Sequence, residues 1–221
     1  MKILAVIPAR GGSKGVTKKN VRLLKNKPLI SWTIEAALSS NYVSKTILSS
    51  DDREIIDVAK EYGCEVPYVR DKNLAQDNTP SIAVVLDAIK HCPGYDWVML
   101  LQPTSPFRTN DDIDRAVEKL HYSNSKSCVS VVKIDQNPHW MYELKEDSRL
   151  KKIVSGPDYF RRQDVPKIYK LNGAIYLSEI ARIIQTKSFI DDQTLAYEMN
   201  AVASIDIDTE EDFQKCEKIS I

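Results

Sequence analysis

A glycine-rich loop with cations around it is the part of the sequence best suited to chemistry. Residues 2–8 are typical of a short buried strand. The loop that follows is Ala9-Arg10-Gly11-Gly12-Ser13-Lys14-Gly15. Glycine has no Cβ, so backbone N–H groups can turn toward an anion. Because Arg10, Lys14 and Lys19 add positive charge here, the segment predicts a polyphosphate-binding site.

The distribution of charge favours a local anionic ligand. Residues 1–34 hold eight Lys or Arg and no Asp or Glu, whereas the whole chain balances 31 basic against 31 acidic residues. A neutral chain with one basic region is not typical of a surface that coats nucleic acid. The glycines at 11, 12 and 15 match neither the Walker pattern nor the dinucleotide pattern. The alternative is an ordinary glycine-rich turn with solvated lysines.

Length and composition indicate a globular α/β protein. The chain has 221 residues and 43% hydrophobic residues, enough for one large domain with or without a small appendage. No apolar run approaches the roughly 20 residues that span a bilayer, so we expect no membrane partner. We expect no secretory leader either. Four widely spaced cysteines without a Cys-x-x-Cys pair indicate reduced thiols in a cytoplasmic protein.

Strand-like and helix-like segments alternate along the chain, which predicts a mostly parallel sheet sandwiched by helices. The expected strands are residues 2–8, 46–50, 65–69, 97–101, 128–132 and 201–205. Helices are expected after residues 28, 51, 79, 110 and 208. Ligands of such sheets bind beyond the carboxyl ends of the strands. The glycine-rich loop, Gln102 and Asp206 each follow an expected strand, so we expect them at one site.

Residues 134–170 interrupt this alternation. They are polar, carry several aromatic side chains and show no clean period. A structureless surface loop of that length is uncommon in a compact domain. We therefore predict a main domain formed by residues 1–133 and 171–221. The insertion at 134–170 is expected to pack on a second subunit, giving a homodimer, with a monomeric lid as the alternative.

Several motifs together resemble the CMP-sialic acid synthetases, also called N-acylneuraminate cytidylyltransferases. The resemblance covers essentially the whole chain. It rests on residues 7–15, Lys19-Asn20, residues 27–30, Leu101-Gln102-Pro103-Thr104-Ser105-Pro106, Arg161-Arg162-Gln163-Asp164, Asn172-Gly173-Ala174-Ile175-Tyr176 and Ile205-Asp206-Ile207-Asp208-Thr209. It implies a Rossmann-like nucleotidyltransferase that joins CTP to a nine-carbon 2-keto sugar acid and releases pyrophosphate. The task of such a protein is positioning and charge stabilisation.

The resemblance implies roles at both substrates. At the nucleotide, catalytic roles fall to Arg10 and Lys19, which would meet the phosphate charge. The expected nucleotide-binding residues are Ala9, Arg10, Gly11, Gly12, Ser13, Asn20, Arg70 and Ser81. At the sugar, Arg162 is the third expected catalytic residue and would pair bidentately with the carboxylate. Gln102, Asn172 and Tyr176 would contact the sugar with it. The alternatives are local: Ser81 could serve the start of a helix, Arg161 and Arg162 could be a solvated surface, and Tyr176 could be a core aromatic.

Asp206 and Asp208 are two residues apart, so on an extended segment both side chains face the same way. Two hard carboxylates suit Mg²⁺ or Mn²⁺, and Mg²⁺ also binds phosphates. The alternative is a helix N-cap at Asp208 or Thr209, which explains Asp208 but not Asp206. With the resemblance, a metal site is the preferred interpretation.

Other functions remain open at this point. A nucleotide-binding protein of the same fold without turnover is one alternative. A dinucleotide-dependent oxidoreductase is another, which the glycine spacing disfavours. Within the enzyme class the acid could be N-acetylneuraminate, legionaminate, pseudaminate or an octulosonate.

Overall fold

The computed structural model describes residues 1–12, 14–159 and 161–220. Six strands form one mixed sheet in the order β10-β6-β9-β5-β1-β4, in which β9 is antiparallel to both neighbours and the other pairs are parallel. The strands are β1 (Ile3–Pro8), β4 (Val43–Ser49), β5 (Trp97–Leu100), β6 (Ser127–Lys133), β9 (Tyr169–Glu179) and β10 (Leu195–Glu198). The predicted mostly parallel α/β architecture is therefore correct for the described residues.

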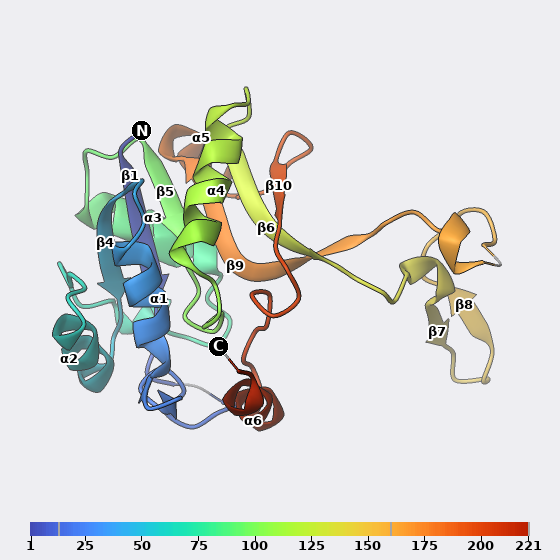
Figure 1. The fold of residues 1–221 in the computed structure, drawn as a ribbon, viewed down its shortest axis with the longest axis horizontal. Coiled ribbons are helices and arrows are strands. Elements are labelled where there is room, and N and C mark those ends of the chain that lie inside the picture. Colours follow the sequence, from blue (N-terminus) through green and yellow to red (C-terminus); the bar gives the residue numbers. More distant parts are fainter. Residues whose placement is uncertain (13, 160, 221) are drawn as a thin grey trace.

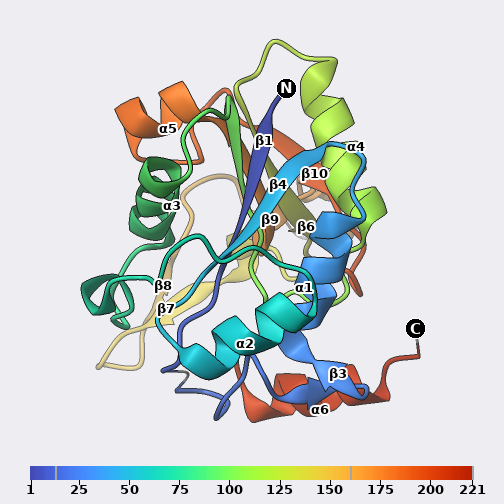
Figure 2. The ribbon, with the colours of Figure 1, turned by 90° about the vertical axis from the view of Figure 1, so that its left-hand side faces the viewer.

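Helices cover both faces of this sheet (Figures 1 and 2). The helices are α1 (Leu29–Leu38), α2 (Arg53–Glu61), α3 (Ser81–His91), α4 (Asn110–His121), α5 (Ile180–Thr186) and α6 (Glu210–Lys218). Alternate residues of β1 point to opposite faces. Ile3, Ala5 and Ile7 pack with α1, α2 and α4, whereas Leu4 and Val6 pack with α3 and α5. Burial on both faces explains the continuous apolar strands.

Helix α6 packs away from the sheet, against the N-terminal segment. Phe213 of this helix shares a buried cluster with Val16, Leu24 and Leu29. The cluster also includes a short hairpin formed by β2 (Leu23–Leu24) and β3 (Lys27–Pro28). The packing joins the two ends of the chain, so residues 206–209, which precede α6, lie beside the glycine-rich loop.

Two expected strands are wrong. Residues 65–69 contribute only an isolated bridge between Glu65 and Ile47, because the chain here runs along the edge of β4 without a continuous ladder. Residues 201–205 form turns rather than a strand. The edge strand is instead β10, and Met199 already donates the last backbone hydrogen bond to β6, at Val131.

The segment between β6 and β9 extends from the body as an arm (Figure 1). It contains a small antiparallel hairpin rather than irregular chain alone. Its elements are η2 (Pro138–Trp140), β7 (Tyr142–Leu144), β8 (Leu150–Lys152) and η3 (Arg162–Asp164). A further short helix, η1 (Lys72–Leu74), lies between α2 and α3 in the chain. Within the described ranges, no helix is long and apolar enough to cross a membrane.

Candidate active site

A polar cavity of about 330 Å³ opens where β1, β4 and β5 end. Parallel strands bring the loops after Pro8, Ser49 and Leu100 to one edge of the sheet. The cavity is lined by five of the residues expected at the nucleotide, Arg10, Lys19, Asn20, Arg70 and Ser81, together with Lys14, Gly15, Asp77, Gln102 and Asp208. It brings together residues that are far apart in the sequence.

Asp77 supplies a negative charge among the cations of this cavity. Its carboxylate lies 2.5 Å from Nη1 of Arg10 and also pairs with the Lys14 ammonium. Hydrogen bonds from Lys14 and Arg10 hold the pKa of Asp77 below its ordinary value. Arg10 Nη1 also lies 3.4 Å from the Ala75 carbonyl. The loop after η1 is thereby attached to the glycine-rich loop.

The glycines serve close packing of the loop. A Cβ at Gly15 would lie 2.0 Å from the Asp208 carbonyl oxygen, and one at Gly11 would lie 2.5 Å from Asp52 Oδ2. The Gly11 N–H donates to Asp51 Oδ1 at 3.2 Å, and the Ala9 N–H donates to the Ser49 carbonyl at 3.0 Å. These two amides are thus engaged within the protein. Of the other expected phosphate contacts, Gly12 has open space around it and Ser13 lies outside the described residues.

Asn20 and Arg70 are buried polar side chains at the cavity wall. Asn20 donates from Nδ2 to the Arg10 carbonyl at 3.1 Å, and its Oδ1 has no hydrogen-bond partner in the described chain. Arg70 donates from Nε to Ser49 Oγ at 3.0 Å and from Nη2 to the Ser49 carbonyl. Burial lowers the pKa of Arg70. Ser81 is exposed in the first turn of α3 and does not cap it. These groups can hydrogen-bond a nucleoside.

A second, larger cavity of about 880 Å³ lies beside the first. It is bounded by the ends of β6 and β9 and by the segment before α6. Four residues of the sequence prediction line it, namely Gln102, Asn172, Tyr176 and Asp206. Three lysines, Lys133, Lys170 and Lys215, and three aspartates, Asp135, Asp206 and Asp212, also line this cavity. The lysines can pair with an anionic group of a ligand, and the rest of the lining offers both polar and apolar surface.

Gln102 lies at the junction, because it lines both cavities. Gly173 faces it from β9 with a φ of +78°, a left-handed conformation that favours glycine. A Cβ added there would lie 3.3 Å from Gln102 Oε1 and 4.0 Å from Asp206 Oδ2. The glycine therefore allows β9 to approach the Gln102 side chain closely.

Asn172 and Tyr176 differ in how free their polar groups are. Asn172 accepts from Ser130 Oγ at 2.5 Å and donates to Ser204 Oγ at 2.9 Å. Its amide is thus committed to holding β9 against its neighbours. Tyr176 packs against Phe189 with ring centroids 5.5 Å apart. Burial raises the pKa of the Tyr176 hydroxyl, so the neutral phenol faces the cavity.

Asp206 and Asp208 lie on either side of the junction. Asp206 lines the larger cavity and Asp208 the smaller one. The Ile207 N–H between them donates to the Thr104 carbonyl at 2.9 Å, which fixes the pair beside the Gln102 loop. Lys19 Nζ donates to the Ile207 carbonyl at 2.7 Å and to Asp208 Oδ1 at 3.2 Å.

The carboxylates fit a divalent cation in two respects. Burial raises the pKa of Asp206, the neighbouring Thr104 hydroxyl lowers it, and the charge of Asp208 raises it. Oδ1 of Asp206 has no hydrogen-bond partner in the described chain. An orphaned buried carboxylate oxygen suits a ligand that supplies positive charge. The helix cap is Thr209, with Asp212 completing a capping box, so Asp208 is not needed as the cap. Among described residues there is no cluster of three or more acidic, His or Cys ligands, and a Mg²⁺ site that shares phosphate oxygens does not need one.

The structure leaves Arg162 untested, because its side chain lies outside the described residues; its backbone begins η3 in the arm.

Sequence reasoning missed Asp77 and Arg108. Arg108 donates to the carbonyl oxygens of Gln102 and Ala174. The only signal for Arg108 was its place just after the Pro103–Pro106 motif. Asp77 carried no signal beyond its charge in a polar loop.

Comparison with known proteins gives a consistent result. A family model described as Cytidylyltransferase matches residues 4–220. The CMP-N,N'-diacetyllegionaminic acid synthase of Legionella pneumophila is 42% identical over 99% of this chain and 96% of its own. A pseudaminic acid cytidylyltransferase of Campylobacter jejuni is 35% identical over 97% of this chain and 94% of its own.

Two further similarities concern a longer protein and a solved structure. An N-acylneuraminate cytidylyltransferase of Escherichia coli is 35% identical over 96% of this chain, which spans 51% of that relative. The fold is similar to the structure of a CMP:2-keto-3-deoxy-manno-octonic acid synthetase complexed with CTP. That match has a TM-score of 0.74 and 17% identity over 98% of this chain and 97% of the other.

Proposed function

Because the chain belongs to the cytidylyltransferase family, we propose that it transfers CMP from CTP to the anomeric hydroxyl of a nonulosonic sugar acid and releases pyrophosphate. The enzyme is a CTP-dependent cytidylyltransferase of the acylneuraminate group. Activated sugar acids of this kind feed the synthesis of surface glycans.

One observation carries the proposal. The polar cavity at the carboxyl ends of β1, β4 and β5 meets the larger cavity at Gln102, and Asp206 and Asp208 line one cavity each. Two substrates bound in adjoining cavities can bring the sugar hydroxyl to the α-phosphate at this junction. A binding protein with one ligand would not need the second cavity.

In this proposal the smaller cavity holds CTP. Arg10, Lys14 and Lys19 would neutralise the triphosphate, and Lys19 would meet the charge of the departing pyrophosphate. Asn20 and Arg70 would read the nucleoside, since Asn20 has an unused acceptor at the wall.

The larger cavity would hold the sugar acid. Arg162 would pair with its carboxylate through a planar, bidentate contact, and Lys170 of β9 is the competing cation at this cavity. Gln102 and the Tyr176 phenol would hydrogen-bond the ring. Asn172 would act by holding β9, because its amide is engaged within the protein.

Asp206 and Asp208 would hold Mg²⁺ or Mn²⁺ together with phosphate oxygens of CTP. A bound divalent cation supplies positive charge that stabilises the phosphoryl group during displacement. The Ile207–Thr104 hydrogen bond and the contact of Lys19 with the Ile207 carbonyl would hold the two carboxylates at the junction of the cavities.

Among the possible acids, N,N'-diacetyllegionaminate is the first choice for this chain. The identity to the legionaminate enzyme is 42%, against 35% for the pseudaminate and neuraminate relatives. Apolar side chains along the larger cavity, Val132, Met141 and Leu171, can pack against the methyl group of a second acetamido substituent. N-acetylneuraminate and pseudaminate remain the alternatives.

We also propose a homodimer formed through the arm. Leu144 and Leu150 lie directly opposite each other in the hairpin and are 69% and 64% exposed. An apolar pair this exposed on an extended arm is typical of a protein interface. A second copy is the occupant that symmetry favours, since most soluble oligomers are homo-oligomers.

The proposal is tested by pyrophosphate release with CTP and Mg²⁺ against a panel of the four acids. We expect the highest kcat/KM with N,N'-diacetyllegionaminate. A higher kcat/KM with another nonulosonate would change the assigned acid and leave the reaction in place. CTP binding without turnover of any acid would favour a non-catalytic nucleotide-binding protein.

A further inference from the structure

Arg108 is a buried arginine without a carboxylate partner. It is 2% exposed and immediately precedes the cap of α4, and no acidic group of the described chain lies within ion-pair distance. Burial lowers its pKa to about 9, which still leaves the guanidinium charged at neutral pH. Burying a charge without an ionic partner is unfavourable, so a role beyond packing is expected.

The guanidinium joins three separate elements. Nη1 donates to the carbonyl oxygens of Gln102 at 3.1 Å and Ala174 at 2.9 Å. Nη2 donates to Thr33 Oγ1 of α1 at 2.6 Å, and the Thr33 hydroxyl in turn lies 3.4 Å from the Gln102 carbonyl. A planar fork with several donors can serve these acceptors at once, whereas a lysine ammonium cannot match the geometry.

Two of these acceptors hold segments that meet at the larger cavity. Gln102 and Gly173, the neighbour of Ala174, both line this cavity. The two segments are close enough that a Cβ at Gly173 would lie 3.3 Å from Gln102 Oε1. The distance between the two main chains therefore determines where the Gln102 amide points.

We propose that Arg108 is a positioning residue that fixes the Gln102 loop against β9 and so shapes the sugar-acid cavity. The kinetic effect expected from this positioning rests on the proposed function. It does not place Arg108 in contact with either substrate, because the side chain lies beneath the loop. Its loss should therefore affect the sugar acid more than CTP, whose other contacts come from β1 and β4.

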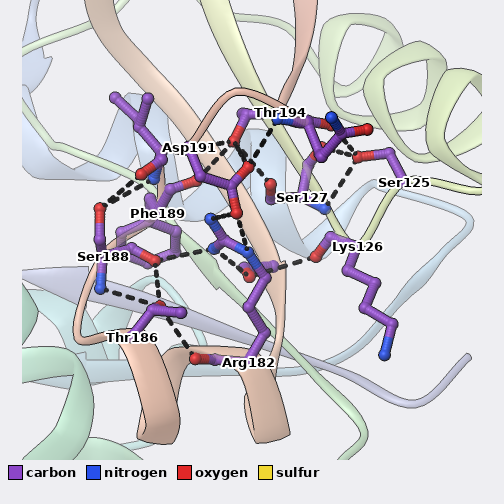
Figure 3. Close-up of polar contacts among 12 residues, drawn as sticks. Ser125, Lys126, Ser127, Arg182, Thr186, Ser188, Phe189, Asp191 and Thr194 are labelled. Carbon is purple, nitrogen blue, oxygen red and sulfur yellow. Dashed lines mark hydrogen bonds and ion pairs between the residues drawn. The ribbon is translucent and has the colours of Figure 1, made fainter.

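Arg182 provides a matched control. It is also a buried arginine, but it pairs with Asp191 through a contact of 2.7 Å and donates to the Ser188 carbonyl at 2.8 Å. Figure 3 shows this network, which ties the loop after α5 to the start of β6 through Ser127 and Thr194. The start of β6 is the end remote from the cavities. A substitution of Arg182 therefore shows the effect of lost stability without lost positioning of the Gln102 loop.

The test compares Arg108→Met, Arg108→Lys, Thr33→Val and Arg182→Met in the full-length protein. We expect Arg108→Met to raise the KM for N,N'-diacetyllegionaminate, or for whichever panel acid is turned over, by about 10- to 100-fold, the range for a lost charged hydrogen bond. The KM for CTP should change by less than about threefold. Arg108→Lys should recover only part of the loss, and Thr33→Val should give a smaller rise in the same KM. Arg182→Met should lower the Tm without changing either KM.

Hydrogen exchange of the free protein tests the same positioning without any substrate. Peptides that contain Gln102 and Ala174 should exchange faster in Arg108→Met than in Arg182→Met. Should the proposed reaction be absent, this measurement alone decides the role of Arg108. Unchanged exchange, or wild-type sugar KM in Arg108→Lys and Thr33→Val, would overturn the proposal. Full rescue by lysine would show that charge matters and position does not. If Arg108→Met fails to fold, the two milder variants carry the test.

Discussion

The carboxylate of Asp77 lies 2.5 Å from the Arg10 guanidinium and also pairs with Lys14, inside the smaller cavity. The Asp77 carboxylate is therefore paired with two of the cations that would meet the triphosphate of CTP. On this account CTP must displace the acidic side chain before its phosphates can bind.

Asp77→Asn should therefore strengthen CTP binding. The side chain is partly exposed, and exposed ion pairs contribute little, so the Kd should fall by at most about fivefold. Calorimetric titration with CTP measures this change. Asp57→Asn is the control, since Asp57 forms an exposed ion pair with Arg53 on α2. Weaker CTP binding in Asp77→Asn alone would mean that Asp77 holds Arg10 and Lys14 in place.

Asp206 should destabilise the metal-free protein. Burial raises the pKa of this carboxyl above its ordinary 3.8, so the folded state keeps the proton to a higher pH than the unfolded chain. Stability is then lost as pH rises from the unfolded value through the raised folded value. Asp206→Asn removes this loss. Its Tm in EDTA should equal that of wild type at low pH and exceed it at neutral pH, whereas a lower Tm throughout would contradict the account.

The same variant should be a poor catalyst. Loss of a group that stabilises charge in the transition state commonly costs on the order of 10²–10³ in rate. Pyrophosphate release by Asp206→Asn at saturating Mg²⁺ measures this cost. Turnover near that of wild type would remove Asp206 from the proposed metal site.

Arg162 should act on the sugar acid rather than on CTP. A nonulosonic acid is ionised at neutral pH, and arginine offers a planar fork matched to its carboxylate. Arg162→Lys should raise the KM for the acid, and Arg162→Ala should raise it more. Loss of one partner of a charge pair at a binding site commonly costs roughly 2–5 kcal/mol when the pair is shielded from water. Lys170→Met tests the competing cation. If CTP affinity falls and acid affinity holds in Arg162→Lys, the two substrates are placed the wrong way round.

The arm should carry the dimer. Changing Leu144 and Leu150 together to Ser removes the exposed apolar pair and should convert the protein to a monomer, as measured by light scattering after gel filtration. Leu23→Ser is the control, because Leu23 is an exposed leucine of the body. A wild-type protein that stays monomeric on concentration would refute the arm interface.

Local signals predicted much of the fold. The apolar spacing after Asp51 predicted α2, and Asp52 caps it through the Ile55 N–H at 3.1 Å. The run Trp97–Leu101 predicted β5, because a strand buried on both faces has no alternation. Residues 65–69 were also expected as a strand, but they are interrupted by Pro67 and form only an isolated bridge to β4. The antiparallel β9 was not predicted as a strand. It pairs with β5 and β6, from which it is separated in the sequence by the arm.

Site residues were predictable where a polar residue directly follows a strand. Gln102 follows β5 as expected and lines the larger cavity. Asp206 lines the same cavity, although the strand expected before it, at residues 201–205, is absent. Arg108 and Asp77 could not be found this way, because their roles depend on contacts with distant segments. Arg108 donates to the Ala174 carbonyl of β9, 66 residues away in the sequence, and no spacing in the sequence shows that contact.

The reaction is tested most directly by the products formed from CTP and N,N'-diacetyllegionaminate with Mg²⁺, followed by ³¹P NMR and mass spectrometry. The account predicts equal amounts of pyrophosphate and a CMP-sugar in which one phosphate joins cytidine to the anomeric carbon. Release of inorganic phosphate with CDP, or no CMP-sugar from any nonulosonic acid of the panel, would contradict it.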